Sequence, residues 1–273
     1  MLARQMILLL HRWLPHTPIT VVGDGAYSVH ELAVTCQRLD IRLIAPLRSD
    51  ARLYAPAPAY RKGQQGRPRL VGHRIPLLRD LLVHPTTAWH KTTIAWYDQG
   101  PKQIEYSTGT GLWYRGYHHT VPLRWVICRD PDGLREARMY FSTDQGQDAK
   151  AILTNFMKRW SIEVTFEESR LHLGVETQRQ WSDLAIERST PCLLGLFSLV
   201  TLMGFLLYSS DPIPVQKTAW YEKEEATFGT VLAAIRRHLW GNFVYPSVPD
   251  RPDLLLVPRT DLLRFTEALC SSA

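Results

Sequence analysis

"PITVVGDGAYSVHELAVTCQRLDIRLIAPL", residues 18–47, is the stretch that decides the fold class. It begins with a β-branched run that ends at Asp24, and it closes with the apolar run 41–47. Between them, apolar residues at positions 29, 32, 33 and 36 have the spacing of a helix. Strand, helix and strand with short connections predict a parallel βαβ unit with a right-handed crossover, and hence an α/β fold.

The segment after this unit is basic and irregular. Residues 48–79 hold eight Lys or Arg and one acid, and "RKGQQGRPR" (61–69) is rich in glycine and polar residues. Such a composition predicts a loop. Two interpretations of its charge stay open: a solvated basic loop, or a segment that contacts phosphate groups through Arg61, Lys62, Arg67 and Arg69.

Strands and then helices are predicted for the remainder. Residues 89–143 are rich in Thr, Ile, Tyr and Trp, and "QGP" and "PDG" turns separate the runs, which predicts antiparallel strands. Asp144, with Gln147 three residues on, has the form of a capping box and predicts a helix that runs to Leu173, before Gly174. Further helices are expected at about 190–208 and 223–240, and Asp130 is expected to be a turn residue.

Composition limits the class of protein. The chain of 273 residues has a net charge of +6, which permits a nucleic-acid partner without requiring one. The four cysteines, Cys36, Cys128, Cys192 and Cys270, form no CxxC motif and are expected to be reduced, buried thiols of a cytoplasmic protein. The uncharged run 192–208 is at the lower limit for a membrane span, and we expect a buried core helix there instead.

One helical face carries alternating charge. In "RWSIEVTFEESR" (159–170), a period of 3.6 residues places Arg159, Glu163, Glu167 and Arg170 on one stripe with Phe156. Geometry alone leaves two interpretations open. The stripe is either a surface row of i,i+4 ion pairs or a face on which a carboxylate works beside two arginines.

The spacing of this stripe resembles a family signature. Phe156, Arg159, Glu163 and Arg170 resemble the Tyr-(2)-Arg-(3)-Glu-(6)-Lys signature of bacterial insertion-sequence transposases of the DDE type, with Phe in place of Tyr and Arg in place of Lys. "VVGDGAYS" resembles the segment that carries the second catalytic aspartate of that family. The strand-rich middle of the chain resembles the β-rich insertion between the two motifs, so the resemblance covers roughly residues 15–210.

The resemblance implies a fold, a reaction and a division of the chain. It implies a partial RNase H-like core with a β-rich insertion and a helical C-terminal region. Asp24 and Glu163 would then be catalytic carboxylates that hold Mg²⁺ or Mn²⁺ for phosphodiester hydrolysis and strand transfer at transposon ends. The expected divisions are residues 1–47 for the partial core, 48–143 for the basic loop and insertion, 144–210 for the core helices, and 211–273 for the tail.

The resemblance also assigns roles to the neighbours of Glu163. Arg159 and Arg170 would contact DNA phosphates, although Arg170 keeps the charge of the family's Lys without its geometry. The resemblance places Phe156 with the DNA-binding residues as well, but it lacks the hydroxyl of Tyr, so packing is the role that we favour for its ring. Glu167, one turn from Glu163, is the reserve candidate for a carboxylate. The adjacent histidines 118 and 119 point to opposite faces if they lie in a strand, which argues against a shared metal site.

A third carboxylate is missing from this scheme. The family's first aspartate lies on a strand well before the second, and the 23 residues before Asp24 contain no acid. We therefore expect an N-terminally truncated transposase that is inactive alone, in which the strand at 18–24 has an open edge. The alternative is a non-catalytic DNA-binding remnant. DNA is the expected partner, with a possible homodimer, no membrane association and no small-molecule substrate.

Overall fold

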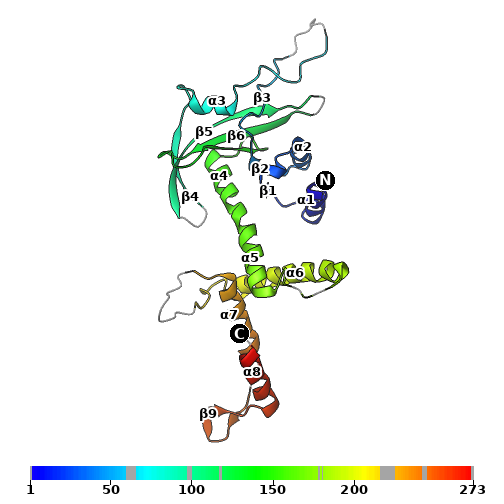
Figure 1. Ribbon diagram of the computed structural model, residues 1–273, viewed down its shortest axis with the longest axis vertical. Coiled ribbons are helices and arrows are strands. Elements are labelled where there is room, and N and C mark those ends of the chain that lie inside the picture. The colour runs from blue at the N-terminus through cyan, green and yellow to red at the C-terminus, as the bar shows by residue number, and fades with distance from the viewer. Residues whose placement is uncertain are drawn as a thin grey trace. The chain divides into compact units, whose positions relative to one another are not determined.

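The computed structural model describes residues 2–59, 66–96, 100–116, 119–177, 179, 181–215, 225–241 and 245–271. It divides the chain into two compact units, residues 1–163 and 164–273, which are described separately below. The first unit has an α/β fold built on a mixed sheet, as the sequence predicted (Figure 1). This sheet and its helices are consistent with an RNase H-like DDE fold.

The predicted βαβ unit is confirmed. Strand β1 (Thr20–Val22) is followed by the short 3₁₀ helix η1 (Gly25–Tyr27), by α2 (His30–Arg38) and by β2 (Arg42–Pro46). The strands pair in parallel, with Thr20 opposite Arg42 and Val22 opposite Ile44. The backbone of the connection turns sharply after α2, where Asp40 has a φ of 54°. The apolar run of β2 is buried on both faces, which explains why its sequence does not alternate.

Antiparallel strands extend this unit, also as predicted. The strand order is β1-β2-β7-β6-β5-β3, and β4 also pairs with β5. All pairings beyond β2 are antiparallel, and the β6–β7 hairpin turns at Gly133 with a φ of 68°. Asp130 accepts a hydrogen bond from the backbone N–H of Asp132 at 3.1 Å, which confirms it as a turn residue. The strands are β3 (Leu53–Tyr54), β4 (His90–Ala95), β5 (Pro101–Trp113), β6 (Val121–Arg129) and β7 (Arg138–Ser142).

The two faces of the sheet form two apolar cores. On one face, α1 (Leu2–Trp13), α2 and α3 (Leu78–Val83) contribute Ile7, Leu32 and Leu78 to a cluster with the strands. On the other face, α4 (Ala149–Met157) contributes Ile152 and Phe156 to a separate cluster. The sheet is therefore covered on both sides by helices, with α2 and α4 in different clusters (Figure 1).

The long helix predicted from Asp144 to Leu173 is interrupted. Residues 158–160 form a 3₁₀ turn, η3, between α4 and α5 (Ser161–Leu173), and the helix then ends before Gly174 as predicted. The prediction that Asp144 caps this helix is wrong, because Asp148 accepts the capping hydrogen bond from the N–H of Ala151. Asp144 instead accepts from the N–H of Gly146 and pairs with Arg42 at 3.1 Å.

The second unit is helical. The helix α6 packs on α7 through a small cluster that includes Val200, Leu232 and Ile235. A two-stranded hairpin and a terminal helix follow. After the end of α5, the elements are α6 (Asp183–Leu207), α7 (Phe228–Gly241), β8 (Ser247–Val248), β9 (Arg251–Leu255) and α8 (Arg259–Ser271).

Two expectations about burial are wrong. The run 192–208 was expected to be a buried core helix, but in α6 only Val200 and Gly204 are buried, and Phe205 is 71% exposed. Among the described residues, α6 is the one helix long and apolar enough to cross a membrane by length and composition. Cys36 and Cys128 are buried thiols as expected, whereas Cys192 is exposed. The side chain of Cys270 lies outside the described residues.

Candidate active site and DNA-contact residues

Asp24 lies immediately beyond the parallel strand β1. Its side chain accepts a hydrogen bond from the backbone N–H of Ala26 at 2.8 Å and caps η1. The peptide N–H of Gly23 still donates to Ile44 of β2, so Asp24 leaves the sheet at the level of Pro46. The carboxylate is exposed to solvent and stands where the strands of a parallel unit end, the usual place of ligands in α/β folds.

Glu163 is held by Arg159. The two side chains form an i,i+4 ion pair at 3.0 Å, and the carboxyl side chain of Glu163 is 43% exposed. The guanidinium of Arg159 also lies 5.9 Å from the ring centre of Phe156, within the range of a cation–π contact. Its Nε is buried and makes no hydrogen bond within the described part of the chain. Of the two interpretations of the charged stripe, a surface i,i+4 ion pair therefore applies to Arg159 and Glu163.

Phe156 is a core residue. Its side chain is 4% exposed, and its ring centre lies 4.4 Å from that of Tyr140. Tyr140 is opposite Pro46 in the sheet, so α4 reaches the end of β2 at Phe156. The packing role expected for a Phe at this position is confirmed.

The remaining stripe residues have other neighbours. Arg170 donates to Glu176 at 3.1 Å, within the second unit. Glu167 is exposed. Glu168, outside the predicted stripe, pairs with His172 at 3.2 Å. The 3₁₀ turn at 158–160 also winds more tightly than an α-helix, so the face calculated for one continuous helix is not kept across it.

The described carboxylates are not grouped as the ligands of a metal centre would be. No three His, Cys, Asp or Glu side chains among the described residues are grouped closely enough to hold an ion. The interactions that the structure gives these two acids are separate: Asp24 accepts from Ala26, and Glu163 pairs with Arg159. Asp24 keeps one oxygen available, which fits a single hard cation that retains several waters. The pair of ions of a two-metal site would require further ligands.

The described arginines of the stretch 61–69 face solvent. Arg67 and Arg69 are exposed, while Arg61 and Lys62 lie outside the described residues. Nearby, Arg48 donates two hydrogen bonds of 2.9 Å to Asp50, and these bonds lower the pKa of Asp50 to about 2. Sequence reasoning did not single out this pair, although an acid just after β2 was a visible signal.

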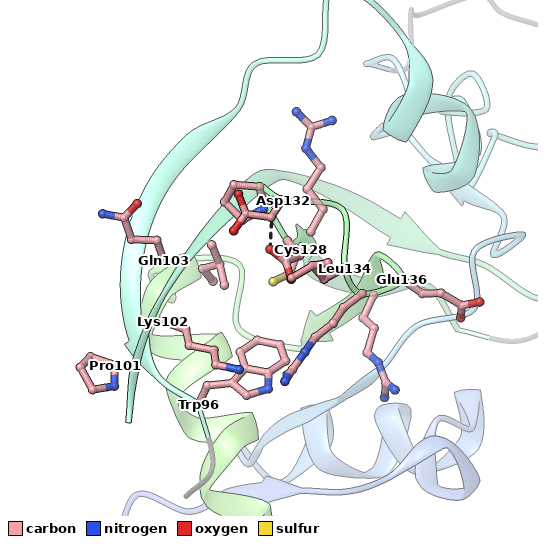
Figure 2. A pocket seen from close by; sticks show the side chains of 14 residues that line it. Trp96, Pro101, Lys102, Gln103, Cys128, Asp132, Leu134 and Glu136 are labelled. Carbon is pink, nitrogen blue, oxygen red and sulfur yellow. Dashed lines mark hydrogen bonds between the residues drawn. The ribbon is translucent and has the colours of Figure 1, made fainter. Parts of the chain in front are cut away.

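A cavity of about 740 Å³ lies on the β-rich part of the first unit. Figure 2 shows Trp96 and Lys102 on one side of it and Asp132 on the other. Arg135 lies over the Trp96 ring at 5.4 Å. The sequence analysis did not predict this cavity, because its walls come from Trp96, the first residues of β5, the end of β6 and the β6–β7 hairpin, which only the strand register brings together.

Comparison with known proteins supports the family suggested by the signature. None of the curated proteins compared with the chain matches it. Residues 1–118 match the model of a family described as "DDE superfamily endonuclease". The matched part contains β1, α2, β2 and Asp24, and it ends before the segment of Glu163. The match supports a DDE-type transposase family and, with it, a nuclease or transposase type of function acting on DNA.

Proposed function

We propose that this chain is a DDE-type transposase component that binds DNA through its basic segment and does not cleave DNA alone. The observation that carries the proposal is Asp24 at the end of the half-buried parallel strand β1, inside the part that matches DDE endonucleases. Among the described residues, the side chain of Asp24 makes one hydrogen bond, from the N–H of Ala26 as the cap of η1, and this bond uses only one of its two oxygens. We assign Asp24 and Glu163 to the site that would hold Mg²⁺ or Mn²⁺.

The fold supports a common location for these two acids. Asp24 and Phe156 are both level with Pro46, because Val22 pairs with Ile44 and Tyr140 with Pro46. Asp24 and the part of α4 at Phe156 therefore lie near the same end of β2. Glu163 follows Phe156 by about 10 Å along a helix.

The proposed lack of cleavage follows from the number of ligands. Mg²⁺ or Mn²⁺, when bound, neutralises charge on phosphoryl oxygens and activates a water. Asp24 and Glu163 are two carboxylates where the family's site has three, and no described cluster supplies a further ligand, so this chain's own residues would position such an ion weakly. The residues left to act are the arginines, which bind phosphate and orient DNA.

The first experiment measures cleavage. The purified chain and its Asp24→Asn and Glu163→Gln variants are each incubated with transposon-end duplexes and Mg²⁺ or Mn²⁺. The control is Asp253→Asn, which removes a carboxylate from an exposed ion pair far along the chain. We expect DNA binding without metal-dependent cleavage in all four proteins. Cleavage that both site variants abolish and the control retains would show that the chain is a complete nuclease.

The second experiment measures binding. The Arg67→Ala, Arg69→Ala double variant should weaken binding to all sequences and lower the slope of log K against log salt by roughly 2, if each arginine neutralises one phosphate. Arg251→Ala with Arg264→Ala is the matched control, since both arginines are exposed but already paired with Asp253 and Asp261. Equal losses in the two double variants, or no DNA binding by the native chain, would overturn the DNA-binding role.

A membrane location is the competing interpretation of α6. We propose a cytoplasmic protein without a membrane span, because α6 uses Gly204 for close packing on Val231 of α7. A DNA partner also requires access to the chromosome. Recovery of the expressed chain with the membrane fraction after removal of aggregates would contradict this part of the proposal.

A further inference from the structure

Asp24 stands between two glycines whose surroundings differ. The N–H of Gly23 donates to the carbonyl of Ile44 in β2 at 2.9 Å, so Gly23 is still bonded to the sheet. A Cβ on Gly23 would lie 2.7 Å from the Cβ of Tyr27, closer than real Cβ atoms approach, whereas a Cβ on Gly25 would meet nothing within 4 Å. Glycine at position 23 therefore allows the side chain of Tyr27 to lie directly on the backbone beside Asp24.

The contact between Tyr27 and Gly23 closes the turn that holds Asp24. Tyr27 is the last residue of η1, and its N–H donates to the carbonyl of Asp24 at 3.1 Å. Within this turn, the N–H of Ala26 donates to Oδ1 of Asp24 at 2.8 Å. Tyr27 is 43% exposed and belongs to neither of the apolar clusters described for the first unit, so its packing on Gly23 contributes to the turn rather than to the core.

A turn of three residues needs such a contact to keep one geometry. The hydrogen bonds of a 3₁₀ turn are less well aligned than those of an α-helix, and Gly25 gives the first residue of η1 additional backbone freedom. Because the N–H of Gly23 is fixed by β2, the side chain of Tyr27 ties the far end of the turn to the sheet. The orientation of the Asp24 carboxylate therefore depends on Tyr27 through the N–H of Ala26.

We propose that Tyr27 is a positioning residue, which holds the Asp24 carboxylate so that its Oδ2 can bind a hard divalent cation. This inference rests on the proposed function, in which Asp24 belongs to the site for Mg²⁺ or Mn²⁺. The bond from Ala26 engages Oδ1, and no other hydrogen bond or ion pair of this carboxylate is found in the described part of the chain. Oδ2 therefore binds an ion without breaking a contact. Groups that orient a metal ligand through a hydrogen bond contribute to metal affinity in this way.

Solvent exchange of the Ala26 amide tests the positioning without metal. It is measured by NMR on the full chain labelled with isotope-enriched alanine, with Ala26→Gly to identify the signal. We expect exchange about 10-fold faster in Tyr27→Ala and in Gly23→Ala, because each change breaks the contact that keeps the Ala26–Asp24 bond closed. Tyr27→Phe should exchange at the native rate, since the atoms that pack on Gly23 do not include the hydroxyl. Gly25→Ala, the matched control, should also keep the native rate, and an unchanged rate in Tyr27→Ala would overturn the proposal.

Titration with Mn²⁺ then tests the use of the carboxylate. Bound Mn²⁺ broadens the signals of nearby nuclei, so we expect the Ala26 signal to broaden in the native chain and not in Asp24→Asn. Tyr27→Ala should raise the dissociation constant for Mn²⁺ by about 10-fold or more, whereas Tyr27→Phe and Gly25→Ala should leave it unchanged. Binding that depends on Asp24 but is equally tight in Tyr27→Ala would overturn the positioning role alone. A native signal that does not respond to Mn²⁺ would overturn the metal site of the proposed function as well, and circular dichroism verifies that each variant is folded.

Discussion

Replacing Phe156 by Ala should destabilise the first unit by about 3–5 kcal/mol. The ring is 4% exposed and packs on Tyr140, so the change removes nearly a full side chain of buried apolar surface, worth about 1.5–3 kcal/mol, and leaves a cavity in the cluster beneath α4. The aromatic pair itself contributes about 0.5–1.5 kcal/mol of the total. Phe166→Ala, at a position 42% exposed in α5, is the control and should cost about 1 kcal/mol or less.

Urea unfolding followed by circular dichroism and tryptophan fluorescence measures both variants. Similar losses for Phe156→Ala and Phe166→Ala would refute the assignment of Phe156 to the core. A second variant, Phe156→Leu, separates packing from DNA contact, because it keeps most of the volume and costs about 1.5 kcal/mol or less. We expect its DNA affinity to equal that of the native chain. A tenfold loss of affinity with the fold intact would show that the ring contacts DNA.

The remaining predictions concern glycines and thiols. Gly204→Ala should destabilise the second unit by about 1–3 kcal/mol, since its Cβ would lie 2.5 Å from Val231. The Cβ of Gly195→Ala meets nothing within 4 Å, so this change should stabilise α6 by up to about 1 kcal/mol. Changes in melting temperature of the same sign for both variants would contradict the prediction. Burial raises the pKa of Cys36 to about 11 and that of Cys128 to about 12, so both should resist a thiolate-selective reagent at pH 8 until the chain unfolds. Because these thiols ionise near pH 9 once unfolded, the free energy of unfolding should decrease as pH rises from about 9 to about 11, and Ala at both positions should remove that decrease.

The sheet was predictable from sequence because its patterns are local. β1 and β2 are short, rich in β-branched residues and bounded by turn residues, and the helix between them has a clear helical period. The type and the order of these three elements could therefore be predicted from the sequence. The antiparallel strands were recognised for the same reason. The register and the strand lengths were not predictable: β5 runs unbroken from Pro101 to Trp113, across Gly109 and Gly111. Gly109 leaves room for the Trp125 ring, a contact made by a distant residue.

The helical boundaries depended on competing caps. Asp144 and Asp148 both precede a helical run, and a capping box was visible only for the first. Arg42, on a strand 102 residues earlier, pairs with Asp144 and holds it outside the helix, so Asp148 caps the helix instead. The exposure of α6 was unpredictable for a similar reason. An uncharged sequence indicates burial, but which surface covers it depends on tertiary contacts, and within its own unit α7 covers only one side.

The Arg159–Glu163 pair shows why a signature and a surface ion pair are not exclusive. Glu163 is 43% exposed, so the pair contributes at most about 1 kcal/mol to stability. A charge-assisted hydrogen bond from Arg159 to a phosphate contributes more free energy than this ion pair, so the phosphate can displace Glu163. Among the described residues, the buried Nε of Arg159 makes no hydrogen bond that would oppose the rearrangement. Displacement of Arg159 by DNA would release the carboxylate of Glu163 at the moment when phosphate oxygens arrive. On the proposed assignment, the spacing that makes an i,i+4 pair in the free chain would supply both an anion contact and a metal ligand in the bound one.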